Sequence, residues 1–272
     1  MLKKCGEGKM VDKMIEKLIR KLPRPIKESL KSLYLKWNLK TIWDDELLEN
    51  LVEFYNEYMK YKDFRLNKEE AKCLCRVAMR INADLWRILN PKTEEEVEKF
   101  YEITPYYPFE LAYWHMQRYQ RKFRKEIVNL SFGEVLEYGA GIGDLCIELA
   151  KRGLNVTYVD VQSMNMEFAK FVFKKKGYKI CILDAEKDWD KIWEKYYDTI
   201  ICLDVIEHLT KPKEVLEQMA KHLRKGGKLI ITGLNYDSTE SHPMHFRLSF
   251  DVEKLLTSYS LRKEKDFLWV KI

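Results

Sequence analysis

Apolar positions recur with two different spacings, and the change of spacing divides the chain near residue 130. Within residues 10–22 apolar side chains return every three or four residues with lysine and arginine between them, as on one face of an amphipathic helix. The same spacing predicts helices over about 26–37, 44–60, 68–89, 93–102 and 108–128. Asn67 and Thr93, each followed by acidic residues, are predicted to cap two of them. The first half is therefore expected to be helical.

The second half alternates short apolar runs with helical stretches. Strands are predicted at 134–138, 155–160, 178–183, 198–203 and 227–232, and helices near 143–152, 163–175, 187–196 and 212–224. Runs such as TIICL are apolar without alternation, which is typical of parallel strands covered on both faces. A loop over 234–249, a helix opened by Asp251 and a last strand in FLWVKI complete the pattern.

These patterns predict an α/β fold: a doubly wound, Rossmann-like sheet preceded by a helical N-terminal region. We expect the helical region to cover residues 1–129 and the sheet domain residues 130–272.

Composition agrees with a soluble globular protein, because 46% of the residues are hydrophobic and 34% are charged. The sequence has no run of about 20 apolar residues and no signal-peptide pattern, so we expect a cytoplasmic protein. Six scattered cysteines fit that compartment. The abundance of lysine, glutamate and isoleucine hints at a thermophilic source.

The positive charge is concentrated at the N-terminus. Residues 1–40 contain twelve basic and four acidic residues, so the net charge of this segment exceeds the net charge of +6 of the whole chain. The basic helices within 9–40 have three interpretations: ordinary solvated helical faces, a surface that lies on anionic membrane, or a surface that binds nucleic acid.

The strongest local signal is the segment EVLEYGAGIGDLCIELA. A strand ends at Glu137, the turn contains Gly139, Gly141 and Gly143, and a helix follows at once. Glycines allow such a turn and let the backbone approach a ligand. The dinucleotide pattern GxGxxG would need glycine where Asp144 stands, so that interpretation is weakened.

The segment resembles the first motif of class I S-adenosylmethionine-dependent methyltransferases, and four further motifs of that family follow in order. The resemblance covers about residues 130–272 and implies that S-adenosylmethionine is bound and S-adenosylhomocysteine is left as product. It implies that the turn from Glu137 to Gly143 holds the cofactor and that Asp160 accepts bonds from both ribose hydroxyls. Asp184 would bind the adenine amino group, with Ala185 against the ring, and Leu203 would lie beside the sulfonium at the end of the fourth strand.

Candidate catalytic groups follow the fourth and fifth strands, whose carboxyl ends form the mouth of such a sheet. They are Glu207, His208, His242 and His245, which could supply a base and a substrate clamp. The spacing Asp204-x-x-Glu207-His208 also resembles the Glu-x-x-Glu-His cluster with which ubiquinone-pathway and small-RNA 3′-end O-methyltransferases hold Mg²⁺. Metal dependence stays open at this point.

The segment before the sheet carries an aromatic and basic set that either closes over the cofactor or packs the two halves together: Tyr106, Tyr107, Trp114, His115 and Arg118. We therefore expect an S-adenosylmethionine-dependent methyltransferase acting at oxygen, nitrogen or carbon of a small or lipid-like molecule. The alternatives are an RNA or protein methyltransferase and a non-catalytic S-adenosylmethionine-binding subunit.

Overall fold

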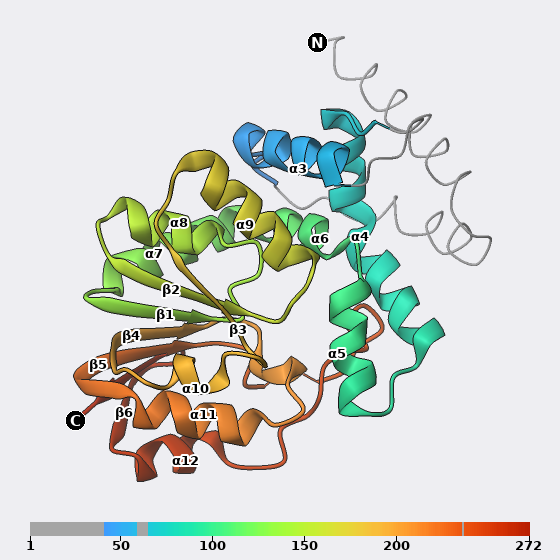
Figure 1. Ribbon diagram of the computed structural model, residues 1–272. Helices are drawn as coiled ribbons and strands as arrows, with labels where there is room; N and C mark the ends of the chain where they lie inside the picture. Colours follow the sequence, from blue (N-terminus) through green and yellow to red (C-terminus); the bar gives the residue numbers. More distant parts are fainter. Residues whose placement is uncertain (1–40, 59–64, 236) are drawn as a thin grey trace, which may run out of the picture. The chain divides into compact units, whose positions relative to one another are not determined.

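The computed structural model describes residues 41–58, 65–235 and 237–272, and Figure 1 traces its elements. The helices expected at 10–22 and 26–37, and the whole basic segment, lie outside the described residues. By compactness the chain forms two units. Unit 1 contains residues up to Asn90 and Thr104–Arg121; unit 2 contains Pro91–Ile103 and Lys122–Ile272. The domain boundary expected at residues 129 and 130 stays a prediction.

Unit 1 consists of α3 (Asp45–Tyr58), α4 (Lys68–Leu89), α6 (Tyr107–His115) and the first turn of α7 (Arg118–Leu130). Asn67 forms the predicted N-cap of α4 within a capping box. The three helices contact one another, and the rings of Tyr55 and Phe109 lie 4.5 Å apart in their core.

The single helix predicted over 108–128 was wrong, because the chain leaves the helical path between α6 and α7. The amide of Ile42 donates to the Met116 carbonyl at 3.0 Å, and Thr41 forms an isolated antiparallel bridge with Gln117. The Gln117 side-chain amide donates both to Thr41 Oγ1 and back to the Tyr113 carbonyl. The break is thus fixed by a segment about 75 residues away in the sequence, beyond the reach of any local pattern.

Unit 2 contains a seven-stranded sheet in the order β3-β2-β1-β4-β5-β7-β6. β1 (Glu134–Tyr138), β2 (Asn155–Asp160), β3 (Cys181–Asp184), β4 (Tyr197–Cys202) and β5 (Leu223–Ile231) are parallel neighbours. β7 (Leu268–Lys271) joins β5 antiparallel, and β6 (Leu261–Lys265) pairs with β7. The order reverses between β1 and β4, which is the place where doubly wound sheets bind ligands.

Helices cover both faces of this sheet, as Figure 1 shows. One core joins the strands to α7, α8 (Asp144–Lys151) and α9 (Met164–Lys176). The other joins them to α10 (Trp189–Ile192), α11 (Pro212–Lys221) and α12 (Val252–Ser258). Strand residues such as Ile200 and Ile201 are fully buried on opposite faces, which explains why their run is apolar without alternation. The predicted α/β fold is confirmed.

Three boundaries differ from the sequence pattern for local reasons. β3 begins after residue 178 because Gly177 takes a left-handed conformation and the Tyr178 amide caps α9 by donating to Phe173. β5 begins early, pairing Leu223 with Tyr197 before a register shift. α10 is only four residues long, and the Trp193 amide bonds back to Asp190 where the helix ends.

The C-terminal edge of the sheet is a hairpin. The last strand predicted in FLWVKI is β7, and β6, which was not predicted, pairs antiparallel with it. Asp251 caps α12 as predicted by accepting from the Lys254 amide at 2.9 Å. No helix in the described ranges has the length and apolarity that crossing a membrane requires.

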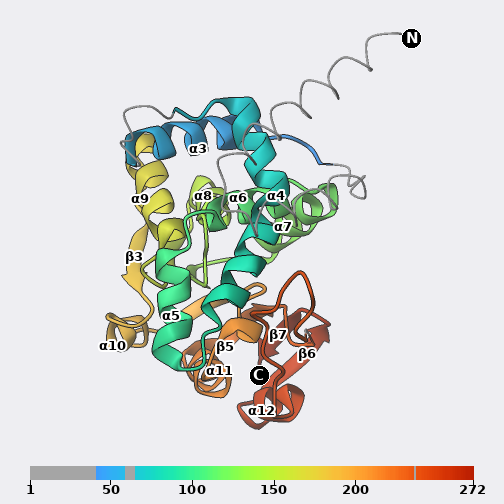
Figure 2. The same ribbon diagram turned by 90° about the vertical axis from the view of Figure 1, so that its right-hand side faces the viewer.

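Helix α5 (Glu94–Ile103) belongs wholly to unit 2, although helices of unit 1 precede and follow it in the chain. It lies next to α9 and reaches the start of α11 (Figure 2). Glu94 accepts from the Thr210 hydroxyl at 3.0 Å and pairs with Lys211 at 3.0 Å. α5 is thereby attached to the chain that follows β4.

Candidate functional site

The turn after β1 can be built only from glycines at two of its positions. Gly139 and Gly143 both have φ of +71°, in the left-handed region. A Cβ atom on Gly139 would lie 2.3 Å from a methyl of Val205, and one on Gly143 would lie 2.6 Å from the ring of Phe173. The turn therefore lies directly against the segment that follows β4.

Asp160, at the end of β2, anchors this turn. One carboxylate oxygen accepts from the Gly141 amide at 2.6 Å and the other from the Val161 amide at 2.8 Å. The Tyr158 hydroxyl donates to the Gly141 carbonyl at 2.7 Å from inside the core. Burial raises the pKa of Asp160 to about 6, with the charge of Asp184 adding to the effect and the two amides opposing it. Each oxygen keeps a lone pair for a further donor.

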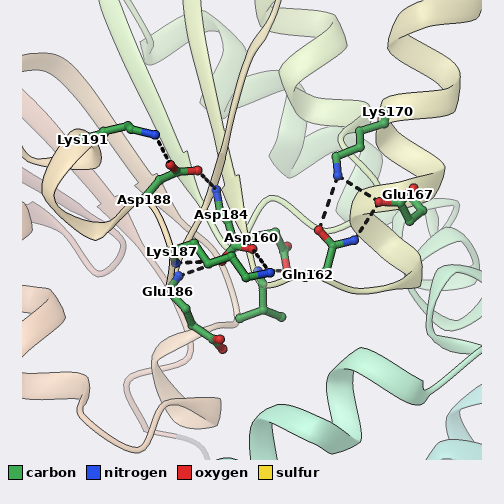
Figure 3. Close-up of polar contacts among 10 residues, drawn as sticks. Asp160, Gln162, Glu167, Lys170, Asp184, Glu186, Lys187, Asp188 and Lys191 are labelled. Carbon is green, nitrogen blue, oxygen red and sulfur yellow. Dashed lines mark hydrogen bonds and ion pairs between the residues drawn. The ribbon is translucent and has the colours of Figure 1, made fainter.

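The turn after β3 is held by its own acid (Figure 3). One oxygen of Asp184 accepts from the amides of Glu186 and Lys187 at 3.0 and 3.1 Å, and the Asp184 amide donates to Asp188. The Ala185 amide donates to the Asp160 carbonyl at 2.8 Å. That amide is therefore already used within the protein.

A side-chain network beside Asp160 was not predicted from the sequence. Gln162 donates to Glu167 at 2.7 Å, and Lys170 donates to Glu167 at 2.9 Å and to the Gln162 carbonyl at 3.5 Å (Figure 3). Burial raises the pKa of Glu167, but the hydrogen bonds from Lys170 and Gln162 outweigh burial and leave this pKa below its ordinary value. The network braces the segment between β2 and α9, next to the predicted ribose-binding acid.

Glu137 lies in the interior, beneath the glycine turn. Only 4% of it is exposed, and the Cys146 thiol donates to its carboxylate at 2.8 Å. Burial raises its pKa to about 7, while the nearby charge of Arg124 opposes that shift. Arg124 pairs with Asp144 at the start of α8 at 2.5 Å. The Glu137 carboxylate therefore links β1 to α8 in the interior, and its predicted role in cofactor binding stays a prediction.

A second group of polar residues follows β4, next to β1 in the sheet. Glu207 lies in a short 3₁₀ helix (Ile206–His208) and is 1% exposed. Neither of its carboxylate oxygens has a hydrogen-bond partner within the protein. Burial raises its pKa to about 8, and the charge of Asp204 adds to the shift. A Cβ atom on Gly233, two residues after β5, would lie 2.1 Å from one of these oxygens, so this position must be glycine.

Histidines from two segments meet beside Glu207. The ring of His208 lies edge-on to that of His245, with centroids 4.7 Å apart, and His242 stacks on His245 at 5.0 Å. The Phe246 amide donates to the Glu207 carbonyl at 2.6 Å, which holds the loop after β5 against the loop after β4. Burial, with the charges of the other two histidines, lowers the pKa of His208 to about 3. His208 is therefore neutral at physiological pH.

The structure brings together three of the four predicted catalytic residues as a possible metal site. One donor atom each of Glu207, His208 and His245 lies within 4.8 Å of the others. Asp204 is not part of this group: it has φ of +53° and its carboxylate accepts from the Thr232 hydroxyl at 2.8 Å. Of the two later histidines, His245 lies in this group and His242 does not. A buried carboxylate with no donor is the kind of group that a divalent cation satisfies, so the residues fit such an ion.

The remaining predicted residues are placed as follows. Leu203 packs partly buried against the core on the α7–α9 face, at the end of β4. Tyr106, Tyr107, Trp114, His115 and Arg118 all belong to unit 1, and their predicted role over the cofactor stays a prediction. Tyr101, whose hydroxyl lies 2.9 Å from His208 Nδ1, was not predicted from the sequence. It lies outside the motifs that carried the resemblance.

The parallel sheet with its glycine turn, the acids at the ends of β2 and β3 and the polar group after β4 define a Rossmann-like methyltransferase. A family model described as a methyltransferase domain matches residues 113–268, more than half of the chain. The chain belongs to that family, and the predicted class I S-adenosylmethionine-dependent methyltransferase is confirmed.

Relatives of known name match a shorter stretch. The chain is 35% identical over 124 residues to a ubiquinone biosynthesis O-methyltransferase of Rickettsia conorii, covering 44% of this chain and 42% of that protein. The protein of the same name from Rickettsia prowazekii is 33% identical over 117 residues, covering 42% and 45%. The chain thus spans less than half the length of these curated relatives. Among solved structures, the N-methyltransferase NodS of Bradyrhizobium japonicum in complex with S-adenosyl-L-homocysteine has a TM-score of 0.48 at 21% identity, covering 64% and 89% of the two chains.

Proposed function

We propose that this protein transfers the methyl group of S-adenosylmethionine to a hydroxyl oxygen of a small or lipid-like molecule. The observation that carries the proposal is the buried Glu207 with its neighbouring histidines, which follows β4 next to the glycine turn. The glycine turn follows β1, and Glu207 with its histidines follows the adjacent strand β4. Val205, in the segment after β4, lies directly against Gly139. The name of the two Rickettsia relatives supports oxygen as the acceptor atom.

The cofactor would bind along the ends of β1, β2 and β3. Asp160 keeps one acceptor position on each oxygen for the two ribose hydroxyls, while its bonds to Gly141 and Val161 fix its orientation. Asp184 would accept from the adenine amino group. Because the Ala185 amide is used by Asp160, Ala185 would contact the adenine ring by packing. Gly139, Gly141 and Gly143 would give the methionine end room to approach the backbone.

The transfer itself needs positioning and a route for one proton. A sulfonium is a good leaving group, so the protein must hold the acceptor oxygen about 3–3.5 Å from the methyl carbon. The hydroxyl proton must leave as the bond forms, and a neutral imidazole can accept it. His242 is the histidine of the cluster that is not among the three grouped donors, and burial lowers its pKa below the ordinary value. We therefore assign His242 as the base that accepts the proton of the substrate hydroxyl.

Glu207, His208 and His245 would hold a divalent cation, with Mg²⁺ favoured by the carboxylate and by the resemblance. When bound, such an ion would stabilise negative charge on the acceptor oxygen. Glu207 would then gain the partner that its buried oxygens lack. The protein itself leaves this carboxylate without a hydrogen-bond donor, so that both oxygens are available to the ion.

We also propose that the protein acts in the cytoplasm and that its substrate is neither RNA nor protein. The predicted roles of the basic segment within residues 9–40 on membrane or nucleic acid fall on residues outside the described ranges.

The experiment is transfer of labelled methyl from S-adenosylmethionine into a host-cell extract, followed by separation into RNA, protein and organic-soluble fractions. The proposal expects label in the organic-soluble fraction, stable to mild alkali as a methyl ether is. Glu207→Gln should reduce the rate at least about 10-fold, as loss of an ion-binding group does. Glu253→Gln, an exposed acid on α12, is the matched control and should leave it unchanged. Label in RNA or protein would contradict the proposal.

A further inference from the structure

Tyr101 of α5 reaches the polar group from outside the region that the family model matches. That match begins at residue 113, whereas Tyr101 lies in the helix that precedes unit 1's second segment. Its hydroxyl oxygen is 2.9 Å from His208 Nδ1, and its ring stands edge-on to the imidazole at 6.0 Å. Both residues belong to unit 2.

The position of Tyr101 is fixed at two points of the same helical face. Glu94 and Tyr101 are seven residues apart, so they lie two turns apart on one side of α5. Glu94 is bound by Thr210 and Lys211, just after His208 in the chain. α5 therefore lies along the segment 208–211, with Tyr101 opposite the imidazole.

The contact occupies one of the two ring nitrogens of His208. A neutral imidazole carries one N–H and one lone pair, and the partner of one nitrogen decides which is which. Because Nδ1 contacts Tyr101, Nε2 is the nitrogen that remains to bind a ligand. It makes no hydrogen bond to Glu207, whose two oxygens have no partner. For His208 to offer a donor atom together with those two residues, the proton must be on Nδ1.

We propose that Tyr101 is a positioning residue: its hydroxyl oxygen accepts the Nδ1 proton of His208 and so keeps a lone pair on Nε2, directed to the group formed with Glu207 and His245. The inference rests on the proposed function for its purpose, but the tautomer is a property of the protein without any ligand. A hydroxyl in this place acts as the outer partner that orients a ligating histidine.

The test is ¹⁵N NMR of histidine-labelled protein without metal, comparing wild type with Tyr101→Phe, which keeps the ring and removes the oxygen. We expect His208 to be the Nδ1–H tautomer in wild type and to shift toward Nε2–H in the variant. Tyr196→Phe is the matched control, because Tyr196 is an exposed tyrosine whose ring lies 5.5 Å from another histidine, His222. It should leave the His208 signals unchanged.

A second readout is Mn²⁺ affinity, measured directly by electron paramagnetic resonance. Tyr101→Phe should weaken binding about 10- to 100-fold, as loss of an outer partner does, while the control keeps the wild-type value. A wild-type Nε2–H tautomer, or a tautomer that Tyr101→Phe leaves unchanged, would overturn the inference. A wild type with the expected tautomer but no methyl transfer would instead refute the proposed function and leave the assignment of Tyr101 standing.

Discussion

At the scale of single residues, Asp160 offers the most direct test of cofactor binding. Asp160→Asn keeps the size of the side chain but removes the charge and presents an amide to two backbone N–H groups. Hydrogen bonds to a charged group contribute about 1.5–3 kcal/mol, so affinity for S-adenosylhomocysteine should fall about 10- to 100-fold by titration calorimetry. Asp266→Asn, at an exposed turn, is the control and should bind as wild type does. Equal affinities in all three proteins would show that Asp160 does not bind the cofactor.

The same residue makes cofactor binding depend on pH. Burial raises the pKa of Asp160 to about 6, so the ligand-free protein takes up a proton as the pH falls through that value. The protonated acid accepts more weakly, and affinity should decrease by up to about tenfold per pH unit below 6. Titrations from about pH 7.5 to 5 check this.

Glu137 also has a raised pKa, about 7, so it could add a component of its own. The comparison with Asp160→Asn separates the two, because only the part due to Asp160 disappears in that variant. A wild type whose affinity stays constant down to about pH 5 would contradict the assignment.

At the scale of the elements, the glycine turn offers a matched pair of substitutions. Gly143 and Gly153 both have positive φ, of +71° and +78°. A Cβ on Gly143 would meet the Phe173 ring, whereas nothing lies within 4 Å of one on Gly153. Gly153→Ala should lower the free energy of unfolding by about 1–2 kcal/mol from backbone strain alone. Gly143→Ala should cost at least about 1 kcal/mol more, measured by urea denaturation.

Phe173→Leu in the Gly143→Ala background tests the cause of that difference. The smaller side chain removes the ring that the new methyl would meet, so part of the excess loss should be recovered relative to the two single variants. An identical loss for Gly143→Ala and Gly153→Ala would show that close packing does not shape the turn.

The elements also show how far sequence reasoning extends. Strands β1 and β2 and helix α4 begin and end where the pattern predicts, because their apolar periods and caps are local. The break between α6 and α7 was missed because it depends on Thr41 and Ile42, far away in the chain.

Some residues of the candidate site were likewise predicted from the sequence, and others were not. The glycines of the turn were predicted from the strand–turn–helix pattern, and the acids at the ends of β2 and β3 from the resemblance to class I methyltransferases. Tyr101 was missed, because nothing in a helical pattern shows which other segment one of its side chains will contact. The sequence also could not show which of His242 and His245 lies with Glu207 and His208, because that depends on the path of the loop after β5.

At the scale of the whole molecule, the two units should respond differently to cofactor. The residues predicted to bind the cofactor at the ends of the strands all lie in unit 2. Ligand at about 100 times its dissociation constant stabilises the form that binds it by about 2.7 kcal/mol. Hydrogen exchange with S-adenosylhomocysteine should therefore slow in the turn 138–143 and at the ends of β2 and β3, with little change in α3 and α4. Equal slowing in both units would contradict this placement of the site.

The central claim is catalysis of methyl transfer, and mass spectrometry of both products tests it most directly. Wild type is incubated with S-adenosylmethionine, a divalent cation and the organic-soluble fraction of a host-cell extract. We predict a product about 14 Da heavier than its precursor, formed in equal amount with S-adenosylhomocysteine. At cofactor concentrations well below the wild-type dissociation constant, its rate of formation should fall about 10- to 100-fold in Asp160→Asn and stay unchanged in Asp266→Asn. Cofactor that binds tightly but is not converted with any fraction of the extract would contradict the account and favour a non-catalytic binding subunit.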